Sequence, residues 1–162
     1  MFERFSIASR RVVFVARWEA GFVGSEVIDS EHLLLGLLRV DPITLQFIAQ
    51  PITLVSVREA AIRWRVPGEK LPTSVDLPIG ADVKLAFENA GSFADAHRSS
   101  LVRTEHLLLA LMTITTSHAA VILGEADASL SRLEQLVSGI QNNRDQDGAQ
   151  FLITDLDFLR DF

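Results

Sequence analysis

The sequence contains no cysteine, so it has neither a disulfide framework nor a thiol nucleophile. Its apolar runs, such as residues 33–38, are far shorter than the ~20 residues that cross a bilayer. The first residues also lack the apolar core and small-residue cleavage site of a signal peptide. Apolar residues nevertheless make up 48% of the chain, which is typical of a globular protein. These features predict a soluble, cytoplasmic protein with no membrane partner.

Motifs of catalysis are missing as well. The chain has no G-x-x-x-x-G-K-[ST] phosphate loop, no H-E-x-x-H zinc motif and no nucleophile elbow. His32 and His106 each follow a glutamate, and we interpret each as a packed or capping residue at a helix start. In the alternative, the two histidines meet at a twofold axis and share a metal ion, but no further ligand is apparent. We therefore expect no enzymatic activity, no cofactor and no metal.

Positive charge is also scarce, because the net charge is −6. A broad nucleic-acid interface needs clustered positive charge, so nucleic acid is not an expected partner. Basic residues do gather at Arg10, Arg11 and Arg17, and again at Arg58, Arg63, Arg65 and Lys70. We interpret both groups as solvated helix faces. The net charge still allows an anionic ligand at one small pocket.

What the sequence does contain is a duplication. Glu-His-Leu-Leu-Leu at residues 31–35 recurs at residues 105–109, an offset of 74. The flanking residues match conservatively, from Ser30 with Thr104 to Leu38 with Met112. Internal repeats of this kind indicate two copies of one structural unit. The same offset is expected to hold throughout both copies without a gap.

Apolar periodicity predicts four helices in each copy, and therefore an all-α fold of eight helices. The first helix follows Ser6, a good N-cap, or Gly80, a weaker one. The second helix opens at Ser30 or Thr104, whose hydroxyls are expected to cap it. The third and fourth helices are expected at residues 44–49 and 53–65, and at 117–123 and 127–140.

A stretch rich in proline and polar residues joins the two copies. The predicted domain covers residues 1–141, divided into repeat one (1–66), a linker (67–76) and repeat two (77–141). Residues 142–162 follow as a polar connector and an amphipathic, acidic tail.

The tail has no counterpart in the first copy. Five aspartates against two arginines give residues 144–162 a net charge of −3. Phe151, Leu152, Leu156 and Leu159 fall on one helical stripe, which could dock in a partner's groove or against this domain. A ninth helix that completes the core is the other possibility. Docking within the chain is favoured, because an exposed stripe of this size reduces solubility.

These residues resemble a known family. Phe5-Ser6, an alanine-rich first helix, Ile28 and residues 30–38 strongly resemble the N-terminal domain of Clp unfoldases, the double Clp repeat that precedes their ATPase modules. Residues 1–5 and 10–13 look most like the ClpC branch. The resemblance implies two pseudo-symmetric four-helix repeats, here without ATPase modules.

The resemblance also implies binding and no reaction. Such domains dock substrates, degradation tags or adaptor proteins and pass them to the ATPase ring. In ClpC-like members the glutamate of each Thr-Glu-His motif is associated with recognition of phosphorylated arginine, and the matching residues are Glu31 and Glu105. A carboxylate can pair with a guanidinium, while N–H groups and hydroxyls at a helix start hold the phosphate. Ser6 is expected to supply that hydroxyl in the first copy.

Several positions depart from the family pattern. Gly80 replaces the usual threonine, which removes a hydroxyl from the second site. Asp29 and Arg103 stand where glycine is normal, so Asp29 would repel a phosphate and Arg103 would attract one or neutralise Glu105. The two sites are therefore predicted to be inequivalent.

An apolar surface is the other candidate for binding. Ile79 replaces a typical aromatic residue while Phe2 is kept, and a surface around both is expected to hold apolar peptide side chains. The candidate ligand-binding residues are Phe2, Ser6, Glu31, Ile79, Arg103 and Glu105.

The favoured interpretation is a Clp-repeat protein that docks substrates, adaptors or an unfoldase partner in Clp-type proteolysis. One alternative is a decoy that sequesters cyclic peptides or other small ligands, and another is a fragment of a full Clp ATPase. The two glutamates also have an explanation that needs no ligand. A carboxylate at a helix start is stabilised by the helix dipole by roughly 0.3–1 kcal/mol.

Overall fold

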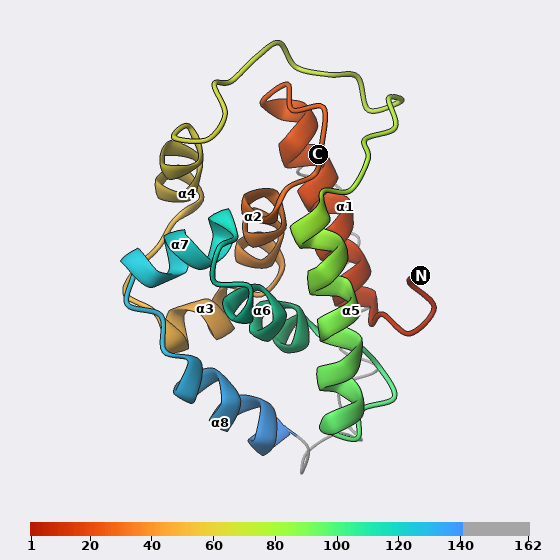
Figure 1. Cartoon of the computed structure of the whole chain (residues 1–162), viewed down its shortest axis with the longest axis vertical. Helices are drawn as coiled ribbons and strands as arrows, with labels where there is room; N and C mark the ends of the chain where they lie inside the picture. The colour runs from red at the N-terminus through yellow and green to blue at the C-terminus, as the bar shows by residue number, and fades with distance from the viewer. Residues whose placement is uncertain (141–162) are drawn as a thin grey trace.

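The computed structural model describes residues 1–140, which form eight α-helices with no β-strand among them (Figure 1). In chain order the helices are α1 (Ile7–Phe22), α2 (Ser30–Val40), α3 (Pro42–Ile48), α4 (Leu54–Ala61), α5 (Ala81–Ala96), α6 (Thr104–Thr113), α7 (His118–Glu125) and α8 (Leu130–Ile140). The predicted all-α fold of two four-helix repeats is confirmed. The predictions for the tail, residues 142–162, lie outside the described residues.

The leucines of the repeated motif fill the core. Leu33, Leu34, Leu107 and Leu108 are each at most 1% exposed, as their helical spacing predicts. No single helix of the described part is both long enough and apolar enough to cross a membrane. By length and composition alone, α6 and α7 together pass that test, across a bend of 92°.

The second helices are capped differently from the prediction. Their N-caps are Asp29 and Arg103, and the predicted serine and threonine caps are instead the first helical residues. The amide of each N-cap residue donates a hydrogen bond of 3.0 Å to Nδ1 of the histidine three positions on, His32 or His106. The glutamate or glutamine of a capping box does the same. The prediction of packed, capping histidines is confirmed, and the predicted hydroxyl caps were wrong.

The hydroxyls reach the opposite repeat instead. The Ser30 Oγ accepts a 3.1 Å hydrogen bond from the amide of Ala119 in α7. The Thr104 Oγ1 donates a 2.8 Å hydrogen bond to Oδ2 of Asp41, the N-cap of α3. Each second helix therefore holds the start of the opposite repeat's third helix, and the two repeats share one core.

The offset between the repeats is not constant. It is 74 residues at the first two helices of each copy, but Asp41 and Ser117, which cap α3 and α7, are 76 apart. Thr53 and Ser129, at the starts of α4 and α8, keep the offset of 76. The gap-free alignment was wrong because Asp41 alone joins α2 to α3, whereas residues 114–117 join α6 to α7. Helix α4 is also shorter than predicted.

Two isolated β-bridges cross between the repeats. Phe5 pairs in parallel with Val102, and Ile79 pairs in parallel with Ile28. Phe5 and Ile79 are counterparts at the offset of 74, as are Ile28 and Val102. The start of each first helix is thus tied to the start of the opposite repeat's second helix, and this crossing decides which residues share a site.

The segment between the repeats lies along the end of α1, as Figure 1 shows. The amides of Gly68 and Leu71 donate 2.8 Å hydrogen bonds to the carbonyl oxygens of Val23 and Gly21. Gly24 turns the chain here with a φ of 72°. A Cβ at this position would lie 2.4 Å from a carbonyl oxygen of the linker, so glycine is required.

Candidate functional site

Each candidate glutamate lies beside the first helix of the opposite repeat. The Gly80 amide donates a 2.9 Å hydrogen bond to the carbonyl of Ile28, which leads into α2. The Ser6 amide donates a 3.0 Å hydrogen bond to the carbonyl of Val102, which leads into α6. The starts of α5 and α2 therefore meet in one place, and the starts of α1 and α6 meet in another.

This crossing corrects the expected composition of the two sites. Site one comprises Asp29, Glu31 and Gly80, and site two comprises Ser6, Arg103 and Glu105. The expected combination of Ser6 with Glu31, and of Gly80 with Glu105, was wrong. An alignment of the two copies pairs residues of the same repeat, whereas the β-bridges connect residues of different repeats.

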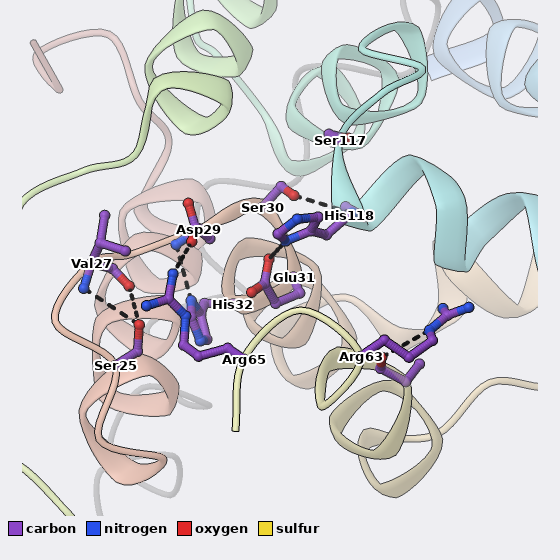
Figure 2. Close-up of polar contacts among 12 residues, drawn as sticks. Ser25, Val27, Asp29, Ser30, Glu31, His32, Arg63, Arg65, Ser117 and His118 are labelled. Atoms are coloured by element: carbon purple, nitrogen blue, oxygen red, sulfur yellow. Dashed lines mark hydrogen bonds and ion pairs between the residues drawn. The ribbon is translucent and has the colours of Figure 1, made fainter. Parts of the chain in front are cut away.

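Glu31 in site one already has a partner. Its Oε2 lies 2.8 Å from Nδ1 of His118, the first residue of α7, and the Glu31 side chain is 1% exposed. The His118 ring stacks on the indole of Trp64 with 4.2 Å between ring centroids. Figure 2 shows Glu31 and His118 pointing toward one another between α2 and α7. A guanidinium that approached Glu31 would have to displace this imidazole.

Asp29 in site one is engaged as well. A guanidinium nitrogen of Arg65 lies 2.6 Å from its Oδ2, a contact that is visible in Figure 2. On its other side Asp29 faces Gly80, where a Cβ would lie 2.4 Å from Asp29 Oδ1. Gly80 thus makes room for Asp29 and contributes no hydroxyl. In site one each carboxylate therefore contacts a basic group, although the buried Nε of Arg65 has no hydrogen-bond acceptor within the described residues.

A metal ion is the other ligand to consider at site one. Asp29, Glu31 and His118 place one ligand atom each within 4.8 Å of one another. Carboxylate and imidazole groups are common zinc ligands. Arg65 and His118 already occupy the two carboxylates, so an ion would have to break both contacts. The expectation of no metal stays a prediction.

Glu105 in site two has different surroundings. It is 6% exposed, and the Thr104 hydroxyl lies 3.4 Å from its Oε2, which is a long contact. Within residues 1–140, no basic group forms an ion pair with Glu105. The neighbouring Arg103 has a buried Nε with no hydrogen-bond acceptor in the same part of the chain. Site two therefore offers a carboxylate to a cation and the Arg103 guanidinium to an anion, while the Ser6 hydroxyl is bonded to Ser9.

Burial controls the protonation of these groups. It raises the pKa of Glu31 and of Glu105 above the usual glutamate value, against the opposing effects of His118 on Glu31 and Arg103 on Glu105. A cation bound at either carboxylate would favour its charged form. Burial also lowers the pKa of the capping histidine His32 to about 4.

The His32 pKa predicts how stability depends on pH. The folded-state pKa of about 4 lies below the ordinary value of 6.5. The contribution of neutral His32 to the free energy of unfolding is therefore complete above pH 6.5 and is lost as pH falls toward 4. By about pH 5 the loss should be about 2 kcal/mol. In His32→Gln, which keeps an acceptor for the N-cap amide, this part of the pH dependence should disappear from urea unfolding curves. Equal pH dependence of the two proteins would contradict the assignment.

Phe2 and Ile79 occupy different environments. Phe2 packs edge-on against Phe5 and Phe87, with ring centroids 5.1 and 5.5 Å apart. Ile79 is the counterpart of Phe5, not of Phe2, and it pairs with Ile28. The described residues that line an open depression at the N-terminus are Met1, Phe2, Glu3, Arg10 and Val13. Ile79 is not among them, and its place in an apolar binding surface stays a prediction.

The sequence interpretation did not include His118, Arg65 or Trp64 among the site residues. They come from the start of α7 and the turn after α4, far from residue 31 in sequence. The sequence marks them in one way only, because their counterparts in the other repeat are of a different type. At the offset of 76, His118 matches Pro42 and Trp64 matches Ile140. Residues that differ between the repeats are those that make site one unlike site two.

Comparisons with known proteins agree with this architecture. The family described as the Clp repeat (R) N-terminal domain matches residues 4–126 and 78–151. The chain is 30% identical over 141 residues to the chloroplastic chaperone protein ClpD1 of Oryza sativa subsp. japonica, covering 82% of this chain and 15% of that protein. It is 29% identical over 152 residues to the chaperone protein ClpB of Oceanobacillus iheyensis, covering 93% of this chain and 19% of that protein.

Solved structures show the same arrangement of helices. The N-terminal domain of ClpD from Arabidopsis thaliana has a TM-score of 0.68 at 26% identity, covering 89% of this chain and 99% of that structure. The Hsp104 N-terminal domain from Candida albicans has a TM-score of 0.66 at 16% identity, with coverage of 89% and 94%, a likeness of fold alone. The chain spans less than a fifth of the length of the curated relatives described above. The predicted similarity to the ClpC branch stays a prediction.

Proposed function

Because the chain belongs to the family of Clp repeat (R) N-terminal domains, we propose that it is a non-catalytic docking module in Clp-type protein handling. It binds a substrate protein, an adaptor or an unfoldase partner, and any unfolding is done by a separate ATPase module. The described helices carry no phosphate loop, which supports the view that binding and unfolding are done by different modules. We place the protein in the cytoplasm, although the ClpD relatives are named as chloroplastic.

The arrangement of site two is the observation that carries the proposal in detail. Glu105 is a buried carboxylate without a basic ion-pair partner in the described chain, and a guanidinium is a suitable ligand for it. Arg103 follows Val102, whose carbonyl accepts the Ser6 amide at the start of α1, and a guanidinium and a helix N-terminus both favour a phosphate. An arginine side chain phosphorylated on its guanidinium combines the two groups. We propose that this modification is recognised here on substrate proteins.

Site one differs in three respects. Its glutamate contacts His118, its Asp29 would repel a phosphate, and Gly80 provides no hydroxyl. These contacts support a single phosphoarginine site per chain, in contrast to the duplicated fold.

The test is calorimetric titration of free phosphoarginine against wild type, Glu105→Gln and Glu31→Gln. A charge-assisted hydrogen bond contributes roughly 1.5–3 kcal/mol, so Glu105→Gln should weaken binding about tenfold or more. The matched variant Glu31→Gln should bind almost as the wild type does. Thermal unfolding of all three proteins checks that both variants are folded. Equal losses in the two variants, or loss in Glu31→Gln alone, would exclude the assignment to site two.

A second function has one supporting feature, the open depression beside Phe2. A cyclic or apolar peptide could place a side chain there, as the decoy interpretation requires. A pull-down with a ClpC-type ring distinguishes the two functions. Recovery of the ring supports docking, whereas tight binding of a cyclic peptide without recovery of any ring or adaptor supports sequestration.

A further inference from the structure

An aromatic stripe runs along the exposed side of α1. Phe14, Trp18 and Phe22 stand four residues apart, so they lie on one face of the helix. Phe14 is 52% exposed and Phe22 is 44% exposed. The rings of Trp18 and Phe22 are stacked, with 5.1 Å between centroids. We refer to these three residues as the aromatic stripe.

Cationic side chains from three other segments surround the aromatic stripe. The guanidinium of Arg39 lies over the Trp18 ring at 5.3 Å. Arg58 and Lys70 lie over the Phe22 ring at 5.9 and 5.8 Å. These groups come from the end of α2, from α4 and from the linker. The stripe is thus an apolar surface with a positive rim on a protein of net charge −6.

A buried acidic side chain, Glu19, contacts both arginines of this rim. Glu19 is fully buried and binds both Arg39, at 3.2 Å, and Arg58, at 2.6 Å. Two guanidinium groups therefore share a single carboxylate. The cationic groups that border the stripe, with Lys70 from the linker, favour an acidic partner.

The fold itself does not require the stripe. At the offset of 74, the positions of the aromatic stripe are occupied in α5 by Glu88, Ser92 and Ala96. Helix α5 has the same length as α1 and also packs on its own second helix. The aromatic residues of α1 are therefore an addition to one repeat, and a shared structural role does not explain them.

We propose that the aromatic stripe is the docking site of this chain's own C-terminal segment, residues 151–162. The segment carries three phenylalanines, at 151, 158 and 162, for an aromatic surface. It carries Asp155, Asp157 and Asp161 against the single Arg160, for a positive rim. The segment thus complements the aromatic stripe in apolar character and the cationic side chains around it in charge.

The chain between them is long enough for this contact. Residues 141–150 can extend ~33–36 Å. A domain of this size has a radius of gyration of about 14 Å. The connector can therefore span more than twice that radius from the end of α8, and it adds little entropic cost to an intramolecular contact.

Paramagnetic relaxation in the chain of residues 1–162 tests the proposal. The sequence has no cysteine, so Thr154→Cys carries a nitroxide label at one position only. We expect amide signals of α1 residues 14–22 to lose intensity while those of α7 and α8 keep theirs. Raising the salt concentration should partly restore the lost intensity, because screening weakens the attraction to the cationic rim.

The sequence of α5 in the second repeat suggests a variant of the aromatic stripe and a control. Phe14→Glu, Trp18→Ser and Phe22→Ala, made together, copy the face of α5 onto α1 and should abolish the loss of intensity without unfolding the chain. Leu85→Ser removes an exposed leucine, 43% exposed, from α5 and should leave the loss unchanged.

Three results would overturn the proposal. One is the absence of any selective loss, and another is a loss centred on a different surface, such as the depression at Phe2. The third is a loss that appears only between molecules, in a mixture of isotope-labelled and spin-labelled chains, because the occupant would then be a second copy.

Discussion

Glu19→Gln should lower the free energy of unfolding by about 3 kcal/mol, although the change is nearly isosteric. Glu19 is fully buried and binds the guanidinium groups of Arg39 and Arg58. Removing one member of a buried charge cluster leaves the others without compensation, at a cost of roughly 3–5 kcal/mol. The two arginine side chains are 25% and 29% exposed, so water offsets part of this cost. Urea unfolding measures the difference.

The exposed pair of Arg63 and Glu125 is the matched control. It is bidentate at 2.5 and 3.1 Å, but its side chains are 44% and 53% exposed. Exposed ion pairs contribute about 1 kcal/mol or less, so Glu125→Gln should have a small effect. Similar losses in Glu19→Gln and Glu125→Gln would show that the Glu19 cluster does not join α1, α2 and α4 as described.

Gly36→Ala should destabilise the protein by about 2 kcal/mol, even though alanine is the better helix former. Gly36 lies in the middle of α2, and a Cβ there would be 2.4 Å from the carbonyl oxygen of Val12 in α1. Backbone atoms cannot rotate away, so the helices must separate, at a cost of roughly 1–3 kcal/mol or more. The helix propensity of alanine returns up to about 1 kcal/mol of this. Calorimetric or urea unfolding checks the sign.

Gly91 provides the opposite outcome. It also lies inside a helix, α5, but a Cβ there would meet nothing within 4 Å. Gly91→Ala should therefore stabilise the protein by up to about 1 kcal/mol. Stabilisation by both substitutions would mean that α1 and α2 do not approach as closely as the structure indicates.

Local patterns were sufficient to predict the fold. The leucine spacing in residues 31–35 and 105–109 defines a buried helix face, and the duplication then gives the second repeat. The predicted cap at Ser6 is also confirmed, by a hydrogen bond of 3.1 Å from the Ser9 amide. Such features depend on neighbours in sequence, which a single chain displays directly.

The composition of the two sites could not be predicted in this way. Ser6 joins Arg103 because β-bridges cross between the repeats, and an internal alignment contains no information on that crossing. His118 reaches Glu31 from the opposite repeat, where the two-residue shift had also displaced the alignment. Contacts between copies depend on tertiary packing, so they became visible only in the structure.

The most direct test of the account is the number of phosphoarginine molecules that one chain of residues 1–162 binds. Glu105 is buried and offers a carboxylate to a guanidinium, whereas Glu31 is already bonded to His118. Isothermal titration calorimetry should therefore give one site per chain, and that site should disappear in Glu105→Gln. Two equivalent sites, or no binding by the wild type, would contradict the account.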